Sequence, residues 1–218
     1  DDIHFVLITH SHSDHIQAFN TVYNKYPNII FVTDKEIKNE IEVAKKSVYD
    51  DSRFVFIDGL SKGSSLDITS FPLNHDVKCV GFMILDKTTN ESYVHIADNG
   101  KLWDKDLIEL LHNKTYYAIE SNHDLTMQIN DEIRHEGLKR RVLGTYGHTA
   151  NHDAIELSFK LVGDDTKGIM FTHLSEDCNN EDLARLTHNN LIAIWGNKTL
   201  FKDIKIVYAR QYEIVELI

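Results

Sequence analysis

The chain has few cysteines, few prolines and no long hydrophobic run, and each shortage excludes a class of protein. Only 2 of its 218 residues are cysteines, too few for a disulfide framework, so we expect a reducing cytoplasm as its compartment. The longest apolar runs, such as 5–8 and 191–195, fall far short of the roughly 18 residues that a membrane span needs. No Pro-rich linker, repeat or low-complexity segment divides the sequence. These absences predict a soluble protein with a single domain over residues 1–218 and no membrane partner.

Positive charge is also scarce: the chain has 23 lysines and arginines but 34 aspartates and glutamates, which gives a formal net charge of −11. Any nucleic-acid-binding surface built from clustered cations must therefore be local. Hydrophobic residues make up 42% and charged residues 26%, which is ordinary for a globular protein and argues against disorder, collagen or a coiled coil. Histidine is abundant by contrast: 13 are present, and imidazole is the commonest metal ligand in proteins.

Strand-like apolar runs alternate with segments of helical period, which predicts a mixed α/β fold. The expected strands are 3–9, 29–32, 54–57, 80–85, 92–96, 116–119, 168–171, 204–208 and 212–217. Apolar residues three or four apart predict a helix over 14–26, and Thr33 with Glu36 forms a capping box for a second helix through Lys45. Further helices are expected at 104–112, 150–162 and 180–195, whereas 66–96 has the pattern of consecutive strands joined by turns.

One short segment between the first predicted strand and the first predicted helix carries three imidazoles and a carboxylate. It reads Thr9-His10-Ser11-His12-Ser13-Asp14-His15. In an extended segment residues i and i+2 face the same way, so His10 and His12 can approach one cation together. Asp14 and His15 then point toward a neighbouring position. Neutral imidazole with carboxylate is the ligand set of Zn²⁺, and Mn²⁺ or Fe also accept it, so the segment predicts a metal site.

This spacing resembles the H-x-H-x-D-H signature of the metallo-β-lactamase superfamily, and later parts of the chain resemble the remaining motifs of that family in their order. His75 after a strand, Asp98 before Gly100 and His173 after the run 168–171 are similar to its later ligands. The resemblance implies two divalent metal ions, Zn²⁺ or Mn²⁺. It assigns the first metal to His10, His12 and His75, the second to Asp14, His15 and His173, and a bridging position to Asp98.

The same resemblance implies an αββα sandwich, in which two mixed sheets pack face to face with helices outside and carry the metals at one edge. Family members usually place two or three strands and a Gly/Ser-rich segment before the H-x-H-x-D-H strand. Here that strand comes first, so we expect the chain as given to lack those N-terminal strands. Two metals that share a carboxylate and a hydroxide make a nucleophile at neutral pH, which predicts a hydrolase.

Two further motifs are similar to the WalJ/YycJ branch of this superfamily. They are Glu120-Ser121-Asn122-His123-Asp124 and Gly147-His148-Thr149-Ala150-Asn151. The segments Leu138-Lys139-Arg140-Arg141 and Thr172-His173-Leu174-Ser175, the latter followed by Asn179-Asn180, are similar to the same branch. That branch implies a metal-dependent 5′→3′ exonuclease acting on double-stranded DNA. The sequence departs from the branch at Thr149 and Ala150, where Leu and Ser are usual. We therefore predict phosphodiester hydrolysis, with DNA as the substrate.

Catalytic and substrate-contacting roles are predicted for several of these residues. Beside the bridging Asp98, His148 at the predicted start of a helix can donate to a phosphoryl oxygen or protonate the leaving oxygen, and His123 can do the same or support a ligand. Glu120 and Asp124 either orient ligand imidazoles or lie exposed on a loop. The predicted substrate contacts are Thr149, Asn151, Lys139, Arg140 and Arg141, and Arg134 with the run 139–141 is the predicted local track for DNA.

Two alternatives remain open at this point. A small phosphodiester such as a cyclic nucleotide would not need an extended basic track, which suits an acidic chain. A non-catalytic binding module that keeps the scaffold is the second alternative, although a complete ligand set argues against it. The sequence specifies neither the physiological metal nor the oligomeric state.

Overall fold

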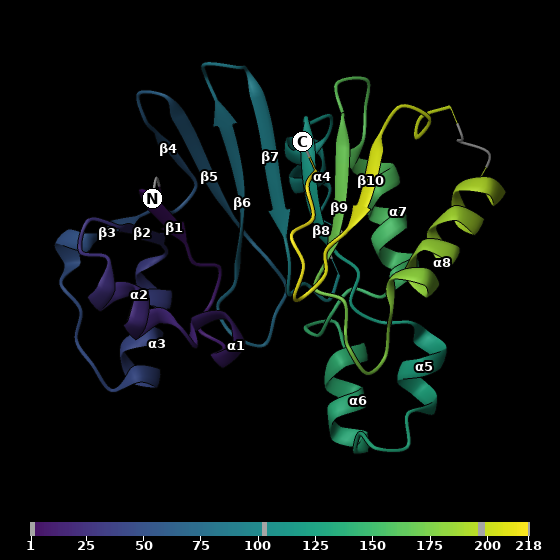
Figure 1. The fold of residues 1–218 in the computed structure, drawn as a ribbon, viewed down its shortest axis with the longest axis horizontal. Helices are drawn as coiled ribbons and strands as arrows, with labels where there is room; N and C mark the ends of the chain where they lie inside the picture. The colour runs from purple at the N-terminus through teal and green to yellow at the C-terminus, as the bar shows by residue number, and fades with distance from the viewer. Residues whose placement is uncertain (1–2, 102–103, 196–198, 218) are drawn as a thin grey trace.

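The computed structural model describes residues 3–101, 104–195 and 199–217, whose strands form two sheets (Figure 1). The small sheet has the order β1-β2-β3, with β1 (Phe5–Leu7), β2 (Ile30–Thr33) and β3 (Phe54–Phe56) all parallel. The large sheet has the order β10-β9-β8-β7-β6-β5-β4. Its strands are β4 (Leu60–Lys62), β5 (Leu66–Pro72), β6 (Val80–Asp86), β7 (Glu91–Ile96), β8 (Tyr116–Glu120), β9 (Gly168–Thr172) and β10 (Lys205–Tyr208).

The first hydrophobic cluster joins the small sheet to its helices and to the large sheet. The connecting helices are α1 (Ser13–Ile16), α2 (Phe19–Lys25) and α3 (Lys35–Lys45), followed by a 3₁₀ turn at Asp51–Arg53. Phe31 of β2 is fully buried, with ring centroids 4.9 Å from Phe19 and 5.5 Å from Phe54. Val80 and Phe82 of β6 belong to the same cluster. Burying a side chain of this size contributes about 1.5 to 3 kcal/mol, so this cluster holds the two sheets face to face.

The second cluster lies between the large sheet and α4 (Lys105–Leu111), α7 (Asn151–Leu161) and α8 (Glu181–Ile194). Tyr117 of β8 is fully buried there, and its hydroxyl lies 2.7 Å from the carbonyl of Leu111 and 2.8 Å from that of Leu161. These contacts tie the ends of α4 and α7 to the sheet. Helices therefore cover the outside of both sheets, and the predicted αββα sandwich is confirmed (Figure 1).

The strand directions bring five carboxyl ends to one edge of the large sheet. Strands β7, β8, β9 and β10 are parallel, and β5 shares their direction because β5 and β7 are both antiparallel to β6. Helices α5 (Leu125–Asn130) and α6 (Glu136–Leu143) lie beyond this edge, and α1 follows β1 near it (Figure 1). Ligands in open α/β sheets bind outside the carboxyl ends of the strands, so this edge is where a site is expected.

Most predicted elements are present, but three predictions need correction. The helix predicted over 14–26 is divided into α1 and α2 at Gln17 and Ala18. The cap of α3 is Asp34, whose side chain accepts the N–H of Glu36, whereas Thr33 ends β2 and donates its hydroxyl to the Ile8 carbonyl. Residues 212–217 form no strand, and β4, α5 and α6 were not predicted. Within the described residues, no helix combines the length and the apolar character required to cross a membrane.

Candidate metal centre

The loop after β1 places His10 at the carboxyl edge of the large sheet. One of its ring nitrogens contacts a neighbouring side chain, and the other has no hydrogen-bond partner among the described residues. His10 is fully buried, and its Nδ1 lies 3.0 Å from the hydroxyl oxygen of Thr9. Its Nε2 is buried and has no hydrogen-bond partner among the residues described. A buried polar atom without a partner costs about 1 to 3 kcal/mol. A cation bound at this nitrogen would remove that cost.

His12 and His75 meet beside His10, although 62 residues separate them in the chain. Nε2 of His75, which follows β5, lies 3.1 Å from Nδ1 of His12. Oδ1 of Asp76 lies 3.2 Å from Nε2 of His12 and 3.4 Å from Nε2 of His75. His10, His12 and His75 offer three ring nitrogens that all lie within 4.8 Å of one another. Three imidazoles in this arrangement fit one Zn²⁺-like ion.

Asp98 follows β7 and lies at the centre of the histidine cluster. The residue is 2% exposed, and its φ of 55° is left-handed, which is uncommon for a residue other than glycine. Its carboxylate oxygens lie 3.1 Å from Nε2 of His15, 3.4 Å from Nδ1 of His148, 3.7 Å from Nε2 of His173 and 3.8 Å from Nε2 of His75. Burial would raise the pKa of Asp98, but the imidazoles of His15, His173 and His10, with His15 foremost, hold it well below its usual range. The carboxylate therefore stays anionic, as a bridging metal ligand requires.

His173 completes a second group of donors next to Asp98. It follows β9 and also has a left-handed backbone, with a φ of 59°. The Nδ2 of Asn122 donates to the His173 carbonyl at 2.9 Å and holds this turn. The ligand atoms of Asp14, His15 and His173 lie within 4.8 Å of one another. Left-handed conformations of this kind concentrate at functional sites, and here two of them occur in one cluster.

Glu120, the last residue of β8, contacts two imidazoles at once. It is fully buried, and its Oε1 lies 2.8 Å from Nδ1 of His148 and 2.8 Å from Nδ1 of His173. Its Oε2 accepts the backbone N–H groups of Asn99 and Thr149 at 3.0 and 3.1 Å. Burial acts to raise the pKa of Glu120, but the two imidazoles hold it low, and Glu120 raises the pKa of both histidines against the effect of burial. With each Nδ1 directed at Glu120, Nε2 is the free nitrogen of each ring.

The two roles left open for Glu120 and Asp124 are thereby separated. Glu120 takes the orienting role, whereas Asp124 caps α5 by accepting the N–H of Met127 at 2.9 Å. Burial also lowers the pKa of His10 to about 3 and lowers the pKa of His75. Imidazole must be unprotonated to bind a metal, so both rings are in their ligand form at neutral pH. The neutral rings of His10 and His75 beside the anionic carboxylate of Asp98 fit a divalent cation.

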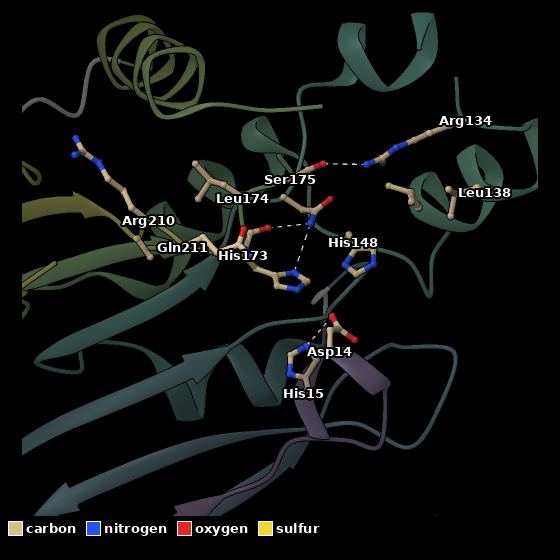
Figure 2. A pocket seen from close by; sticks show the side chains of 13 residues that line it. Asp14, His15, Arg134, Leu138, His148, His173, Leu174, Ser175, Arg210 and Gln211 are labelled. Carbon is tan, nitrogen blue, oxygen red and sulfur yellow. Dashed lines mark hydrogen bonds and ion pairs between the residues drawn. The ribbon is translucent and has the colours of Figure 1, made fainter. Parts of the chain in front are cut away.

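A pocket of about 580 Å³ opens beside this cluster (Figure 2). His148 and His173 point into it, with Asp14 and His15 at the same end, as Figure 2 shows. The rest of its wall comes from α6, from the loop before α6 and from the segments after β8, β9 and β10, through Asn122, Arg134, Leu138, Val142, Leu174, Ser175, Ala209, Arg210 and Gln211. Leu174 and Ser175 follow the predicted ligand His173 in its motif but were given no role. Ala209, Arg210 and Gln211 lie in no motif, because only the strand order brings the segment after β10 to this edge.

The positions of Thr149 and Asn151 do not support the predicted contact with substrate. Both are buried, and neither lines the pocket. The hydroxyl of Thr149 donates to the Asn99 carbonyl, and the amide oxygen of Asn151 accepts from the Ser121 hydroxyl at 2.7 Å and from Nδ2 of Asn179 at 2.8 Å. Their side chains hold the segment between β8 and α7 in place.

The basic run on α6 also lies outside the pocket lining. Nζ of Lys139 donates to the Ile129 carbonyl at 3.0 Å, and Arg141 pairs with Asp76 at 2.6 Å. Arg140 lies exposed. The predicted substrate contact of these three residues is therefore not supported at the pocket, and Arg134 is the basic residue of this region that lines it.

His123 was expected to act in catalysis or to support a ligand, but its surroundings differ from those of His148. Its side chain is buried, and neither ring nitrogen has a hydrogen-bond partner in the described part of the chain. Burial lowers the pKa of His123 to about 4. The ring does not line the pocket, so its position does not allow contact with a substrate there.

The sandwich and its donor set define a class of protein, the metal-dependent hydrolases whose ions sit at the edge of two packed sheets. The model of one family, described as the metallo-beta-lactamase superfamily, matches residues 1–160, and the chain belongs to this superfamily. It is a metal-dependent hydrolase, and its His and Asp clusters are groups that could hold a divalent metal.

Similar proteins agree with this assignment. Exodeoxyribonuclease WalJ of Streptococcus pneumoniae is 32% identical over 202 residues, which cover 88% of this chain and 71% of WalJ. Exodeoxyribonuclease YycJ of Bacillus anthracis is 29% identical over 193 residues, which cover 88% of this chain and 72% of YycJ. The metallo-beta-lactamase fold protein YhfI of Bacillus subtilis shares the fold, with a TM-score of 0.62 and 18% identity over 94% of this chain and 74% of YhfI. The predicted similarity to the WalJ/YycJ branch is confirmed.

Proposed function

We propose that the chain is a binuclear phosphodiester hydrolase that degrades duplex DNA from the 5′ end. One observation carries the proposal: seven donors from distant parts of the sequence converge, and His10, His15, His75 and His173 among them lie within 4.8 Å of the buried carboxylate of Asp98. The names of WalJ and YycJ, both exodeoxyribonucleases, support DNA as the substrate.

The proposed ligands divide into two sets that share Asp98. His10, His12 and His75 would hold one divalent ion, Zn²⁺ or Mn²⁺, and Asp14, His15 and His173 would hold the other. When bound, such a pair of ions lowers the pKa of a shared water and supplies positive charge for the attacked and departing phosphate oxygens. Glu120 supports this arrangement because its contact with Nδ1 of His173 leaves Nε2 for the metal.

His148 is the proposed proton donor. Its Nδ1 lies 2.8 Å from Glu120, its ring lines the pocket, and Nε2 is the atom left to face a substrate. The contact with Glu120 favours the protonated ring, which can give a proton to the departing 3′ oxygen of the nucleotide that is cut away. His123 has no such access and is left out of the proposed catalytic set.

Linear duplex DNA with a label at its 3′ end, incubated with the Mn²⁺- or Zn²⁺-loaded protein, tests the proposal. We expect a ladder of progressively shorter labelled strands, and a label at the 5′ end should appear at once as a mononucleotide. Asp98→Asn should abolish both signals because it removes the shared anionic ligand, whereas Asp124→Asn, at the cap of α5, serves as the control. A native protein that leaves duplex DNA intact with either metal would refute the proposed substrate.

A small phosphodiester is the second candidate substrate, and the size and lining of the pocket favour it. The pocket of about 580 Å³ has the size of a small-molecule site, and the basic run on α6 lies outside its wall. A cyclic nucleotide hydrolysed at a rate that salt hardly changes would favour this candidate, because binding to a DNA backbone weakens steeply with salt.

A further inference from the structure

The pocket beside the metal centre is lined by an arginine whose carboxylate partner is largely exposed. Two arginines line it, Arg134 and Arg210. Arg210 pairs with two carboxylates, Glu181 at 2.7 Å and Glu213 at 2.6 Å. Arg134 pairs with Asp177 at 2.9 Å, and the side chain of Asp177 is 71% exposed. An ion pair with such an exposed carboxylate contributes little, so an incoming phosphate can replace Asp177.

Groups other than Asp177 hold Arg134 in position from the protein side. Its Nη1 donates to Oε1 of the buried Gln128 at 2.9 Å, and its Nη2 donates to the Ser175 hydroxyl at 3.1 Å. Its backbone N–H donates to Oδ1 of Asp131 at 2.6 Å. A guanidinium has five N–H donors, and the acceptors among the described residues engage three of them. Two donors remain for a ligand, on a side chain whose geometry is already fixed.

Ser175 connects Arg134 to the metal centre. It lies two residues after His173, and its backbone N–H donates to the Asn122 carbonyl at 2.8 Å. The side chain of Asn122 in turn donates to the His173 carbonyl at 2.9 Å. Figure 2 shows the contact from Arg134 to Ser175 on the wall of the pocket that also contains His173. The guanidinium of Arg134 is therefore held at a fixed position relative to His173, the proposed metal ligand.

We infer that Arg134, with Ser175, binds the terminal 5′-phosphate of the strand being degraded, while the first phosphodiester lies at the metal centre. This inference rests on the proposed function. The pocket has the size of a site for one small ligand, and Leu138, Val142 and Leu174 supply apolar surface for the nucleoside between the two phosphates. A guanidinium binds phosphate in a bidentate manner, so Arg134 becomes a specificity-determining residue that favours a 5′-phosphate over a 5′-hydroxyl.

Two duplexes that differ only in a 5′-phosphate or a 5′-hydroxyl test the inference with the metal-loaded enzyme. The native protein should show a kcat/KM about ten- to hundredfold higher for the phosphorylated end. Arg134→Gln should bring this ratio close to one, and Arg134→Lys, which keeps the charge, should give an intermediate ratio. Arg185→Gln is the matched control, because Arg185 pairs with Glu181 and does not line the pocket, so the ratio should stay at the native value.

Binding measured without turnover separates this inference from the proposed function. Fluorescence anisotropy with duplexes whose first linkage is a phosphorothioate should give tighter binding of the phosphorylated end, lost in Arg134→Gln. A native protein without preference for either end, or an Arg134→Gln variant that weakens binding of both ends equally, would overturn the inference. Preferential binding through Arg134 without degradation of DNA would support the phosphate site and refute the proposed nuclease.

Discussion

A single carboxylate oxygen, Oε1 of Glu120, lies 2.8 Å from Nδ1 of His148 and 2.8 Å from Nδ1 of His173. The same residue also accepts two backbone N–H groups through Oε2, so the backbone holds the carboxylate independently of the two imidazoles. The proposed metal ligand His173 and the proposed acid His148 therefore depend on one buried side chain.

Replacing Glu120 with Gln should impair catalysis more than folding. The amide has one oxygen where the carboxylate offers two, so it cannot serve both backbone N–H groups and both imidazoles. Loss of such an orienting partner costs about 10- to 100-fold in activity or metal affinity. Steady-state kinetics and metal titration of Glu120→Gln measure the effect, with Asp124→Asn as the control. Native activity in Glu120→Gln would show that the carboxylate does not orient the site.

His188 allows a test of stability at acid pH because it is buried away from the donor cluster. Its Nε2 lies 3.0 Å from the Asn151 carbonyl and its Nδ1 lies 2.9 Å from the Tyr208 hydroxyl. Burial lowers the pKa of His188 from 6.5 to about 4. Between these pH values the unfolded chain binds a proton here and the folded chain does not, so stability falls as pH falls from 6.5 toward 4.

The contribution of His188 to this loss should be up to about 3 kcal/mol. Urea unfolding between pH 7 and pH 4, in the presence of a chelator, measures it. His188→Gln should lose less stability over this range than the native chain, whereas the exposed His4 replaced by Gln should follow the native curve. Equal losses in the native chain and His188→Gln would contradict the prediction.

At the scale of elements, the sequence predicts helices and strands best where a regular pattern coincides with a local cap. Strands β6 to β9 and helices α4, α7 and α8 lie within a few residues of their predicted bounds. The prediction of one helix over 14–26 is wrong because the apolar period continues through two separate helices, α1 and α2, that contact different parts of the molecule. Asp14 and His15 face the donor cluster, whereas Phe19 packs on Phe31 and Tyr49, and the break lets each piece take its own orientation.

Helices α5 and α6 are short, and the apolar pattern of the sequence did not predict them. Their caps are the signal that could have revealed them. Asp124 accepts the N–H of Met127, and the ring of His135 accepts the N–H of Leu138 at 3.1 Å. The omission matters because the loop between these helices carries Arg134 to the pocket.

The cap of α3 provides a test at this scale. Replacing Asp34 with Ala should lower the free energy of unfolding by about 1 kcal/mol, because the N–H of Glu36 loses its acceptor. Asp34→Asn keeps a capping oxygen and should stay close to the native stability. Denaturant unfolding of the two variants checks this, and equal stability of Asp34→Ala and Asp34→Asn would restore Thr33 as the candidate cap.

At the scale of the whole molecule, the proposed ligands are divided between the two sheets. His10 to His15 follow the small sheet, and His75, Asp98 and His173 follow strands of the large sheet. Family motifs were sufficient to select these residues from the sequence. The pocket could not be predicted in the same way, because its wall depends on where the strand order brings Arg134, Ser175 and Arg210.

Metal bound by these residues would connect the two sheets, so its removal should lower stability. A ligand at 100 times its Kd stabilises the folded state by about 2.7 kcal/mol, which is a melting shift of about 5 to 10 °C for a chain of this length. Comparing the melting temperature in excess chelator with that in added Zn²⁺ or Mn²⁺ measures the shift. Amide hydrogen exchange should be slower in β1, β2 and β3 when metal is present. Asp98→Asn should show a smaller shift because the shared ligand is gone. Equal melting temperatures with and without metal would contradict this role of the ions.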